Sequence, residues 1–197
     1  MNNKPLLFAA MQMEARAIGL DAETVGIRAC RLRHDAIPLG TSCVIMAGLG
    51  GALDPALSVG DVIVHGPLGW ASPTVRTGKI HTVDRMISDP AEKASLFKST
   101  GGLAVDMESA IVRQAAEIKG VPFFNIRAIS DTADQAIDAE IFGLVDDIGR
   151  PRPMKAMSLL ARRPGLYGSM RRLQSDTEIA LAKLAQAVRE LLELVRG

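Results

Sequence analysis

Three carboxylate side chains stand at positions where a folded α/β protein would present them to a ligand. Glu14, Glu108 and Asp131 each follow the end of a short apolar segment. Because the carboxyl ends of parallel strands meet at one edge of a sheet, where open α/β folds bind ligands, we expect these side chains to converge. Carboxylates are costly to bury without a purpose, and they can transfer protons or accept hydrogen bonds. The spacing therefore predicts one ligand-binding crevice lined by acids.

Each acid also has a structural interpretation when taken alone. Glu108 opens a predicted helix, where a negative charge is favoured by about 0.3–1 kcal/mol through the helix dipole. Asp131 could cap the turn after its strand, and Glu14 could face solvent from a first helical turn. These alternatives stay open for each residue alone, and the convergence of separate segments is what favours a site.

Arg127 lies inside the apolar segment FFNIRAIS and shares a strand face with Asp131 by alternation. A buried guanidinium needs a carboxylate or an anionic ligand, so Arg127 is either part of an ion pair or a site residue. The glycine-rich run GLGG (48–51) does not fit a dinucleotide fingerprint, because Leu53 takes the place of the third glycine. Close approach of the backbone to a small ligand, or tight packing, remains open for Gly48 and Gly50.

Apolar segments alternate with helical patterns over the first two-thirds of the chain, which predicts an α/β fold with a mixed, mostly parallel sheet flanked by helices. Continuous apolar runs are typical of strands that are covered on both faces. The predicted helices are 12–20, 90–99 and 108–120. The predicted strands are 5–11, 26–32, 41–48, 59–66, 78–84, 102–107 and 121–130.

Residues 1–197 are interpreted as one domain with a helical C-terminal segment over about 154–197. A break is expected at Pro164-Gly165, and Ser175 with Glu178 has the pattern of a capping box that would begin the last helix. That helix carries an apolar stripe of Leu181, Leu184, Val188, Leu191 and Val195. The stripe predicts packing on the sheet, with an oligomer contact as the alternative.

Composition and charge exclude several classes of partner. The net charge is +1 with interspersed signs, which gives no reason to expect nucleic acid. No segment is long and apolar enough to span a membrane, and two cysteines suit a reducing cytoplasm. No His or Cys spacing indicates a metal site or a cofactor. The histidines (34, 65 and 81) are expected to be structural or on the surface, and Cys43 to pack as a small apolar residue.

The segment AVDMESAIVRQAAEIKGVPFFNIRAISDTAD (104–134) resembles the signature stretch of the nucleoside phosphorylase/nucleosidase family. The resemblance extends upstream through AAMQMEARAI, GLGGALDPALSVGDVIV and GKIHTVDRMISDPAEKASLF, in matching order. The tail LLARRPGLYGSMRRL is most similar to the hopanoid-associated phosphorylase branch. Fold, activity and homo-oligomeric assembly like those of the family are therefore expected.

The resemblance implies a role for each acid. It implies that Glu108 binds the ribose hydroxyls, that Asp131 protonates the departing purine at N7, and that Glu14 activates the attacking water. Asp131 would then have to hold a proton near neutral pH, helped by burial or by a neighbouring acid. Arg127 would position the nucleophile or couple to the acid. Met107 would pack on the sugar, Ile141 or Phe142 would cover the base, and Asp106, Gly48, Gly50 and Ser130 complete the expected substrate-binding set.

Two departures from the family pattern bear on the nucleophile. The segment between the first helix and strand 41–48 is shortened by one strand–loop–helix unit, and Leu49 stands where a hydroxyl residue is common. Both changes disfavour phosphate binding. We therefore expect the chain to cleave the N-glycosidic bond of a purine (adenine) nucleoside with water rather than phosphate. Phosphorolysis, with phosphate as co-substrate, and nucleoside binding without cleavage remain as alternatives.

Overall fold

A mixed sheet forms the centre of the computed structural model, which describes residues 4–67 and 74–196. In this described part the sheet has eight strands, with the path β2-β1-β3-β8-β4-β5; β7 pairs with β3, and β6 with β7. All pairs are parallel except β4–β8 and β3–β7, so the predicted mostly parallel sheet is confirmed. The strands are β1 (Lys4–Ala9), β2 (Glu23–Thr24), β3 (Thr41–Ala52), β4 (Val62–His65), β5 (Val75–Thr77), β6 (Ile80–Thr82), β7 (Ala104–Asp106) and β8 (Phe123–Asp131).

The pairing of β3 with β8 sets the position of the predicted site. These two strands are apolar and buried along most of their length, as strands covered on both faces should be. Their parallel register places Arg127 opposite Gly48. A register shift between Gly50 and Gly51 leaves one extra residue in β8 and places Asp131 opposite Gly51. The glycine run therefore lies beside both charged residues of β8.

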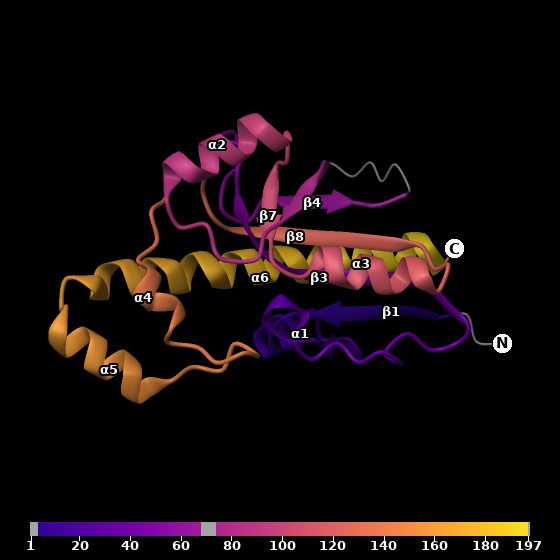
Figure 1. Ribbon diagram of the computed structural model, residues 1–197, viewed down its shortest axis with the longest axis horizontal. Coiled ribbons are helices and arrows are strands. Elements are labelled where there is room, and N and C mark those ends of the chain that lie inside the picture. The colour runs from indigo at the N-terminus through magenta and orange to yellow at the C-terminus, as the bar shows by residue number, and fades with distance from the viewer. Residues whose placement is uncertain (1–3, 68–73, 197) are drawn as a thin grey trace.

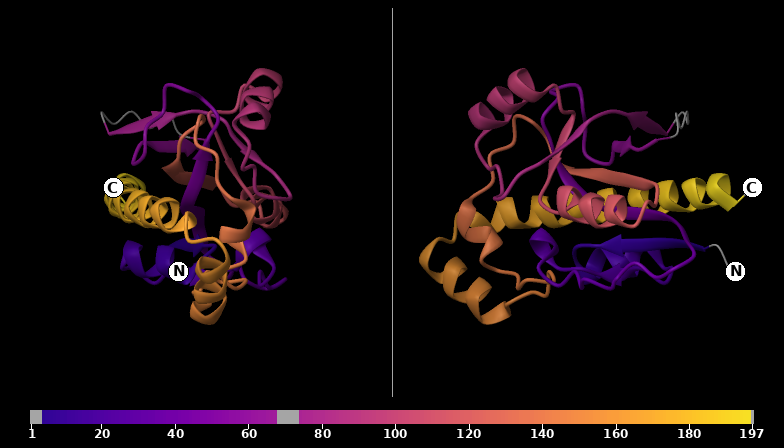
Figure 2. Two further views of the ribbon diagram at one scale, coloured as in Figure 1. Left: turned by 90° about the vertical axis from the view of Figure 1, so that its left-hand side faces the viewer. Right: turned by 45° about the vertical axis from the view of Figure 1, so that its right-hand side comes forward.

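Helices cover the two faces of the sheet differently (Figures 1 and 2). Helix α6 (Leu166–Arg196) packs along one face, and α3 (Ser109–Ile118) packs on the other. Arg127 belongs to the α3 side, because Ala128 next to it belongs to the core under α6. The remaining helices are α1 (Gln12–Ile18), α2 (Pro90–Thr100), α4 (Ala139–Phe142) and α5 (Pro153–Arg162).

The C-terminal segment differs from its prediction in one respect. The break at Pro164-Gly165 is confirmed, but α6 begins at Leu166 and continues without interruption, so a helix start with a capping box at Ser175 is wrong. Buried apolar contacts with the sheet stabilise the long helix, so no cap is needed at its middle. Leu184, Val188 and Leu191 are fully buried against the sheet, which confirms sheet packing for the apolar stripe.

The predicted strand 26–32 is wrong. A short 3-10 turn, η1 (Ile27–Ala29), occupies this position, with positive φ angles at Arg28 and Ala29. This bend turns the backbone amide of Arg28 toward Glu108, 3.0 Å from its Oε1. Residues 19–40 hold only β2 and η1 as regular elements, in agreement with the expected shortening.

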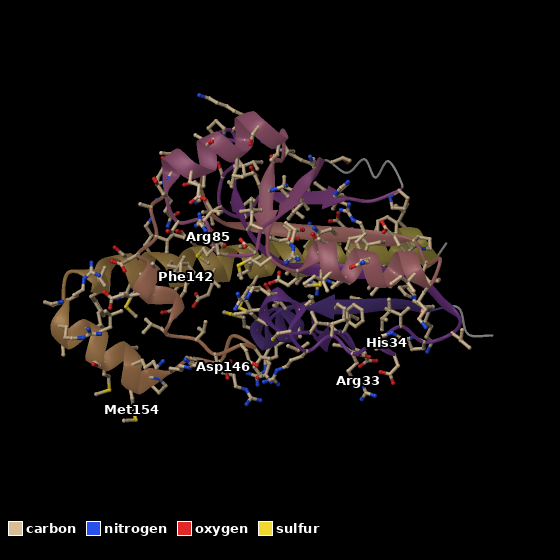
Figure 3. The ribbon with its side chains drawn as sticks, in the orientation of Figure 1. Arg33, His34, Arg85, Phe142, Asp146 and Met154 are labelled. Carbon is tan, nitrogen blue, oxygen red and sulfur yellow. The ribbon has the colours of Figure 1, made fainter. Side chains whose placement is uncertain are left out.

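No helix in ranges 4–67 and 74–196 is long and apolar enough to cross a membrane. Met154 and Met157 on α5 are exposed at the end of the molecule that projects beyond the sheet (Figures 1 and 3). The homo-oligomer stays a prediction.

Candidate active site

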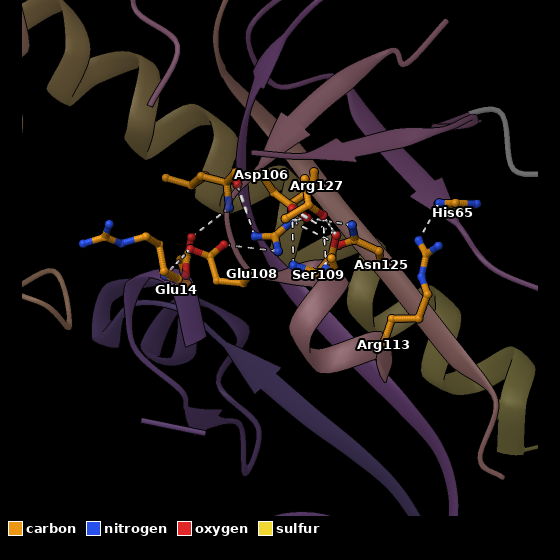
Figure 4. Close-up of polar contacts among 12 residues, drawn as sticks. Glu14, His65, Asp106, Glu108, Ser109, Arg113, Asn125 and Arg127 are labelled. Carbon is orange, nitrogen blue, oxygen red and sulfur yellow. Dashed lines mark hydrogen bonds and ion pairs between the residues drawn. The ribbon is translucent and has the colours of Figure 1, made fainter. Parts of the chain in front are cut away.

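Arg127 is the centre of a buried polar network on the side of β8 that α3 covers (Figure 4). Its side chain is 0% exposed, and its Nε donates to Oδ2 of Asp106 and to Oδ1 of Asn125, both at 3.0 Å. Asn125 also donates to Asp106 at 2.8 Å. Asp106 is thus the structural partner of the guanidinium, and it caps α3 by accepting from the backbone amide of Ser109.

Glu108 lies beside the same guanidinium, at Nη2. Its Oε2 is 3.5 Å from Nη2 of Arg127, and its Oε1 accepts from the amide of Arg28. Glu108 occupies the N-cap position of α3, yet its side chain makes no capping hydrogen bond. The helix-capping interpretation therefore does not explain this acid. Nη2 of Arg127 has no hydrogen-bond partner within the described part, which leaves a buried donor beside Glu108.

Glu14 reaches the network from α1. It is 1% exposed, so the solvent-facing interpretation is wrong. Its carboxylate accepts from the amide of Met11, which is the N-cap of α1, and from the amide of Leu49 on β3, both at 2.8 Å. Figure 4 shows the carboxylates of Glu14 and Glu108 directed toward one another, with Arg127 beside them. Segments far apart in the sequence thus bring two acids and a cation together.

The strand that precedes Glu108 runs in a different direction from the one expected. Strand β7 is antiparallel to β3, so its end does not belong to the shared edge of the parallel strands. Instead β7 starts beyond that edge, with Ala104 opposite Ala52, and runs back along β3 toward Gly50. This direction carries Asp106 and Glu108 back over the face that α3 covers.

The protonation of these acids follows from burial and from a shared cation. Burial raises the pKa of Glu14 to about 7, against the lowering effects of Arg127 and of the two backbone amides. Burial likewise raises the pKa of Glu108, opposed by Arg127 and by the amide of Arg28. Burial also disfavours ionisation of Asp106, but Arg127 and the hydrogen bonds together outweigh it and lower its pKa. Asp106 thus holds the charge that neutralises Arg127, and Glu14 titrates near neutral pH.

Gly48 and Gly50 leave room for Arg127. A Cβ on Gly48 would lie 2.5 Å from Nη1 of Arg127 and 2.8 Å from Oε1 of Glu14. A Cβ on Gly50 would lie 2.9 Å from the carbonyl oxygen of Val105. These glycines bring the strand close to the charged side chains, so tight packing is the role that the contacts support.

Replacing Gly48 with Ala is therefore expected to destabilise the protein by about 1–3 kcal/mol through overpacking, and to displace Arg127 or Glu14. Gly168→Ala is the matched control, because nothing lies within 4 Å of a Cβ at that position on α6. Urea unfolding of both variants checks the prediction. A Gly48→Ala variant as stable as the wild type would show that Arg127 can move away at no cost.

Asp131 lies beyond this network and has a cation of its own. Oδ2 of Asp131 is 2.6 Å from Nζ of Lys93, which is fully buried on α2. Oδ1 of Asp131 accepts from Oγ of Ser130 at 2.9 Å. A neighbouring acid was one of the two means expected to keep a proton on Asp131. That alternative is wrong for this ion pair, because the partner of Asp131 is Lys93. A Cβ on Gly51 would be 2.9 Å from Oδ2 of Asp131.

Lys93 is the buried charge that sequence analysis missed. The helical spacing contained a signal, because Lys93, Leu96, Phe97 and Thr100 share one face of α2 at three- and four-residue steps, and all four are at least partly buried. A lysine on such a face requires a partner.

The buried charges form two groups, the network around Arg127 and the pair of Asp131 with Lys93, which lie next to one another along β3. Glu14 lies against Gly48 and Asp131 against Gly51, a separation of roughly 10 Å at the usual rise of a strand. Six charged residues are buried in the described part, and all of them belong to these two groups. They are Glu14, Asp106, Glu108, Asp131, Lys93 and Arg127.

The remaining predicted residues are less tightly placed. Met107 is half-buried next to Glu108, and Phe142 lies on α4, at the end of the molecule toward which β1 points (Figure 3). Ile141 helps to line a pocket of about 360 Å³ between α4, the segment 135–138 and α6. This pocket contains none of the three predicted acids, which are themselves covered.

Other polar residues lie outside the site. Nδ1 of His65 accepts a hydrogen bond from Nη2 of Arg113 at 3.1 Å, and His34 is exposed. Cys43 is buried in the core under α6, as expected for a small apolar residue. Within ranges 4–67 and 74–196, no group of three or more His, Cys, Asp or Glu side chains is arranged to hold a metal ion.

Comparison with known proteins gives matches at the level of sequence and of structure. The family model of the phosphorylase superfamily matches residues 65–162, a segment that contains Asp106, Glu108, Arg127 and Asp131. A 5′-methylthioadenosine/S-adenosylhomocysteine nucleosidase of Treponema pallidum is 34% identical over 64 residues. That match covers 32% of this chain and only 24% of the relative's length.

Solved structures resemble the whole fold. Futalosine hydrolase of Helicobacter pylori superposes with a TM-score of 0.64 at 17% identity, covering 97% of both chains. A 5′-methylthioadenosine/S-adenosylhomocysteine nucleosidase of the same species gives 0.65 at 17% identity, covering 97% of this chain and 98% of the other. At this level of identity the likeness establishes the fold.

Proposed function

The chain belongs to the phosphorylase superfamily of nucleoside phosphorylases and nucleosidases, and from that premise we propose that it hydrolyses the N-glycosidic bond of a purine nucleoside. Adenine is the proposed base. The supporting relatives are named for methylthioadenosine, adenosylhomocysteine and futalosine, and these compounds define the first substrates to test.

One observation carries the proposal: the buried charges of the described part are four carboxylates and only two cations. Breaking an N-glycosidic bond develops positive charge on the ribose. Once Glu14 and Glu108 are ionised, the cluster carries excess negative charge and stabilises the positive ribose, because fixed charges act strongly in a site from which water is excluded. The same excess repels a phosphate anion. The arrangement therefore favours a neutral nucleoside and a neutral nucleophile.

Each acid has a task in the proposed reaction. Glu14, with a pKa of about 7, is the general base that takes a proton from the attacking water, since a base is most effective when its pKa lies near the working pH. Glu108 accepts hydrogen bonds from the ribose hydroxyls, and Nη2 of Arg127 beside it, which has no hydrogen-bond partner in the described part, donates to the water or to the sugar. Asp131 is assigned to the departing purine.

The substrate is proposed to enter beside α4. The pocket of about 360 Å³ adjoins the segment that follows Asp131 and is lined by Ile141 and by Arg172 of α6. Because the acids are covered in this structure, binding would need the segment after β8 to move outward.

An assay of free base tests the proposal directly. Purified protein is incubated with adenosine, methylthioadenosine, adenosylhomocysteine or futalosine, with and without phosphate, and the free purine base is quantified by chromatography. We expect release of base that does not depend on phosphate. Release only with phosphate would replace water by phosphate as the nucleophile. Tight nucleoside binding without release would make the protein a binding module.

A further inference from the structure

Lys93 is a buried cation to which the proposed function gives no task. Its side chain is 0% exposed, and its Nζ donates to three acceptors. These are Oδ2 of Asp131 at 2.6 Å and the carbonyl oxygens of Thr132 at 2.8 Å and Gln135 at 3.3 Å. An ammonium group that is held this closely to one carboxylate sets what that carboxylate can do.

The contacts of Asp131 are those of a hydrogen-bond acceptor. One oxygen accepts from Lys93 and the other accepts from Ser130, so in this arrangement neither oxygen offers a proton to a ligand. A departing purine, however, needs a proton to neutralise the negative charge that develops on it. Lys93 is the ionisable partner that the structure places within hydrogen-bonding distance of Asp131 and that carries protons.

We propose that Lys93 is the positioning residue of the general acid and supplies, through Asp131, the proton that the leaving purine takes. This inference rests on the proposed function. One N–H bond of the Lys93 ammonium breaks and an O–H bond forms on Asp131. As the C1′–N9 bond breaks and its electron pair moves onto the purine, the proton passes from Asp131 to the purine. The neutral amine of Lys93 afterwards regains a proton from solvent through Asp131.

A purely structural role is the competing explanation. The two carbonyl contacts tie α2 to the segment 132–135, so Lys93 could merely hold that segment in place. The two roles differ in how a change at Lys93 combines with a change at Asp131. If Lys93 acts through Asp131, replacing it lowers kcat little once Asp131 can no longer transfer a proton. If its role is independent and structural, the fold-decreases in kcat from the two changes multiply.

A double-mutant cycle of Lys93→Met and Asp131→Asn therefore tests the inference, with kcat and KM measured for release of the purine base. We expect Lys93→Met to lower kcat by about 10²-fold, within the range of acid catalysis, with KM changed by less than about threefold. In the Asp131→Asn background, Lys93→Met should lower kcat by less than about threefold. Lys98→Met, at an exposed position of the same helix, is the matched control and should retain wild-type kcat.

A second variant separates the proton from the packing. Lys93→Gln keeps an amide that can donate to the carbonyl of Thr132 but carries no transferable proton, and it replaces Lys93→Met in the cycle if that variant does not fold. We expect Lys93→Gln to lose kcat as Lys93→Met does. Wild-type kcat in Lys93→Gln, or losses that multiply in the cycle, would overturn the inference and leave the proposed function intact. A wild-type protein that releases no base would overturn the proposed function, and the inference with it.

Discussion

Replacing Glu14 with Gln is expected to lower kcat/KM for hydrolysis by about 10²–10⁴-fold, the range of a lost general base. The carboxylate of Glu14 lies beside Arg127 and Glu108, and burial raises its pKa to about 7. The wild-type kcat/KM should therefore rise with pH through about 7, because the ionised form is the active base. Gln cannot titrate, so the residual kcat/KM of the variant should not rise with pH through about 7. Initial rates of base release between pH 5 and 9 check both expectations.

Glu117→Gln is the matched control for this prediction, since Glu117 is exposed on α3 and the chemical change is the same. It should keep the wild-type rate and the wild-type pH profile. If kcat/KM of the Glu14→Gln variant still rises with pH through about 7, another group is the base.

The same pKa shift has a consequence for stability. Between pH 4.5, the ordinary pKa of a glutamate, and about pH 7, folded Glu14 keeps a proton that the unfolded chain has lost. The free energy of unfolding contributed by this group therefore falls as pH rises through that window, by up to roughly 3 kcal/mol. Glu14→Gln should lack this loss, so the difference in unfolding free energy between pH 5 and pH 8 should be smaller in the variant than in the wild type.

Asp131→Asn is expected to lower kcat by about 10²–10⁴-fold while the dissociation constant for a nucleoside changes by less than about threefold. Asn keeps the shape of the side chain and can still accept a hydrogen bond, but it provides no acidic proton. Loss of the charge opposite Lys93 should also lower the free energy of unfolding by about 1–3 kcal/mol, the scale of one charge-assisted hydrogen bond. Single-turnover rates, calorimetric nucleoside binding and urea unfolding measure the three quantities.

Asp21→Asn serves as the control for Asp131→Asn, because Asp21 is exposed and belongs to neither group of buried charges. The acid assignment would be wrong if Asp131→Asn kept wild-type turnover. It would also be wrong if the variant lost nucleoside binding in proportion to rate, because the residue would then act in binding rather than in proton transfer.

The core strands and the charged residues of the Arg127 network could be predicted from the sequence, whereas Asn125 was not singled out. Long apolar runs fixed the positions of β1, β3 and β8, because strands covered on both faces leave a continuous apolar pattern. Polar residues that interrupt or follow such runs then stand out. Glu108 and Arg127 were found in this way, and the structure places them within 3.5 Å of one another.

Features that depend on tertiary contacts were missed. Segment 26–32 has a strand-like composition, but the contact of the Arg28 amide with Glu108 bends it into a turn. The middle of α6 contains a local helix-start signal that packing on the sheet overrides. Lys93 was not singled out, because a lysine on a helix is usually exposed and only its position between α2 and Asp131 shows its burial.

The buried charges link the fold to the chemistry. Five of the six lie in α1, α2, β7 and β8, and the sixth, Glu108, is the N-cap residue of α3. Burying four carboxylates with two cations reduces stability, a cost that proteins commonly accept at functional sites. With Glu14 and Glu108 ionised, the resulting excess of negative charge is the physical basis on which we propose water rather than phosphate as the nucleophile.

The most direct measurement follows the oxygen that enters the sugar. The reaction is run in water enriched in ¹⁸O, with phosphate present at millimolar concentration, and the ribose product is analysed by mass spectrometry. Hydrolysis predicts free sugar that carries one ¹⁸O atom for each purine released, with no ribose 1-phosphate. Ribose 1-phosphate without ¹⁸O in its sugar would contradict the account, because phosphate would then be the nucleophile despite the negative charge of the buried cluster.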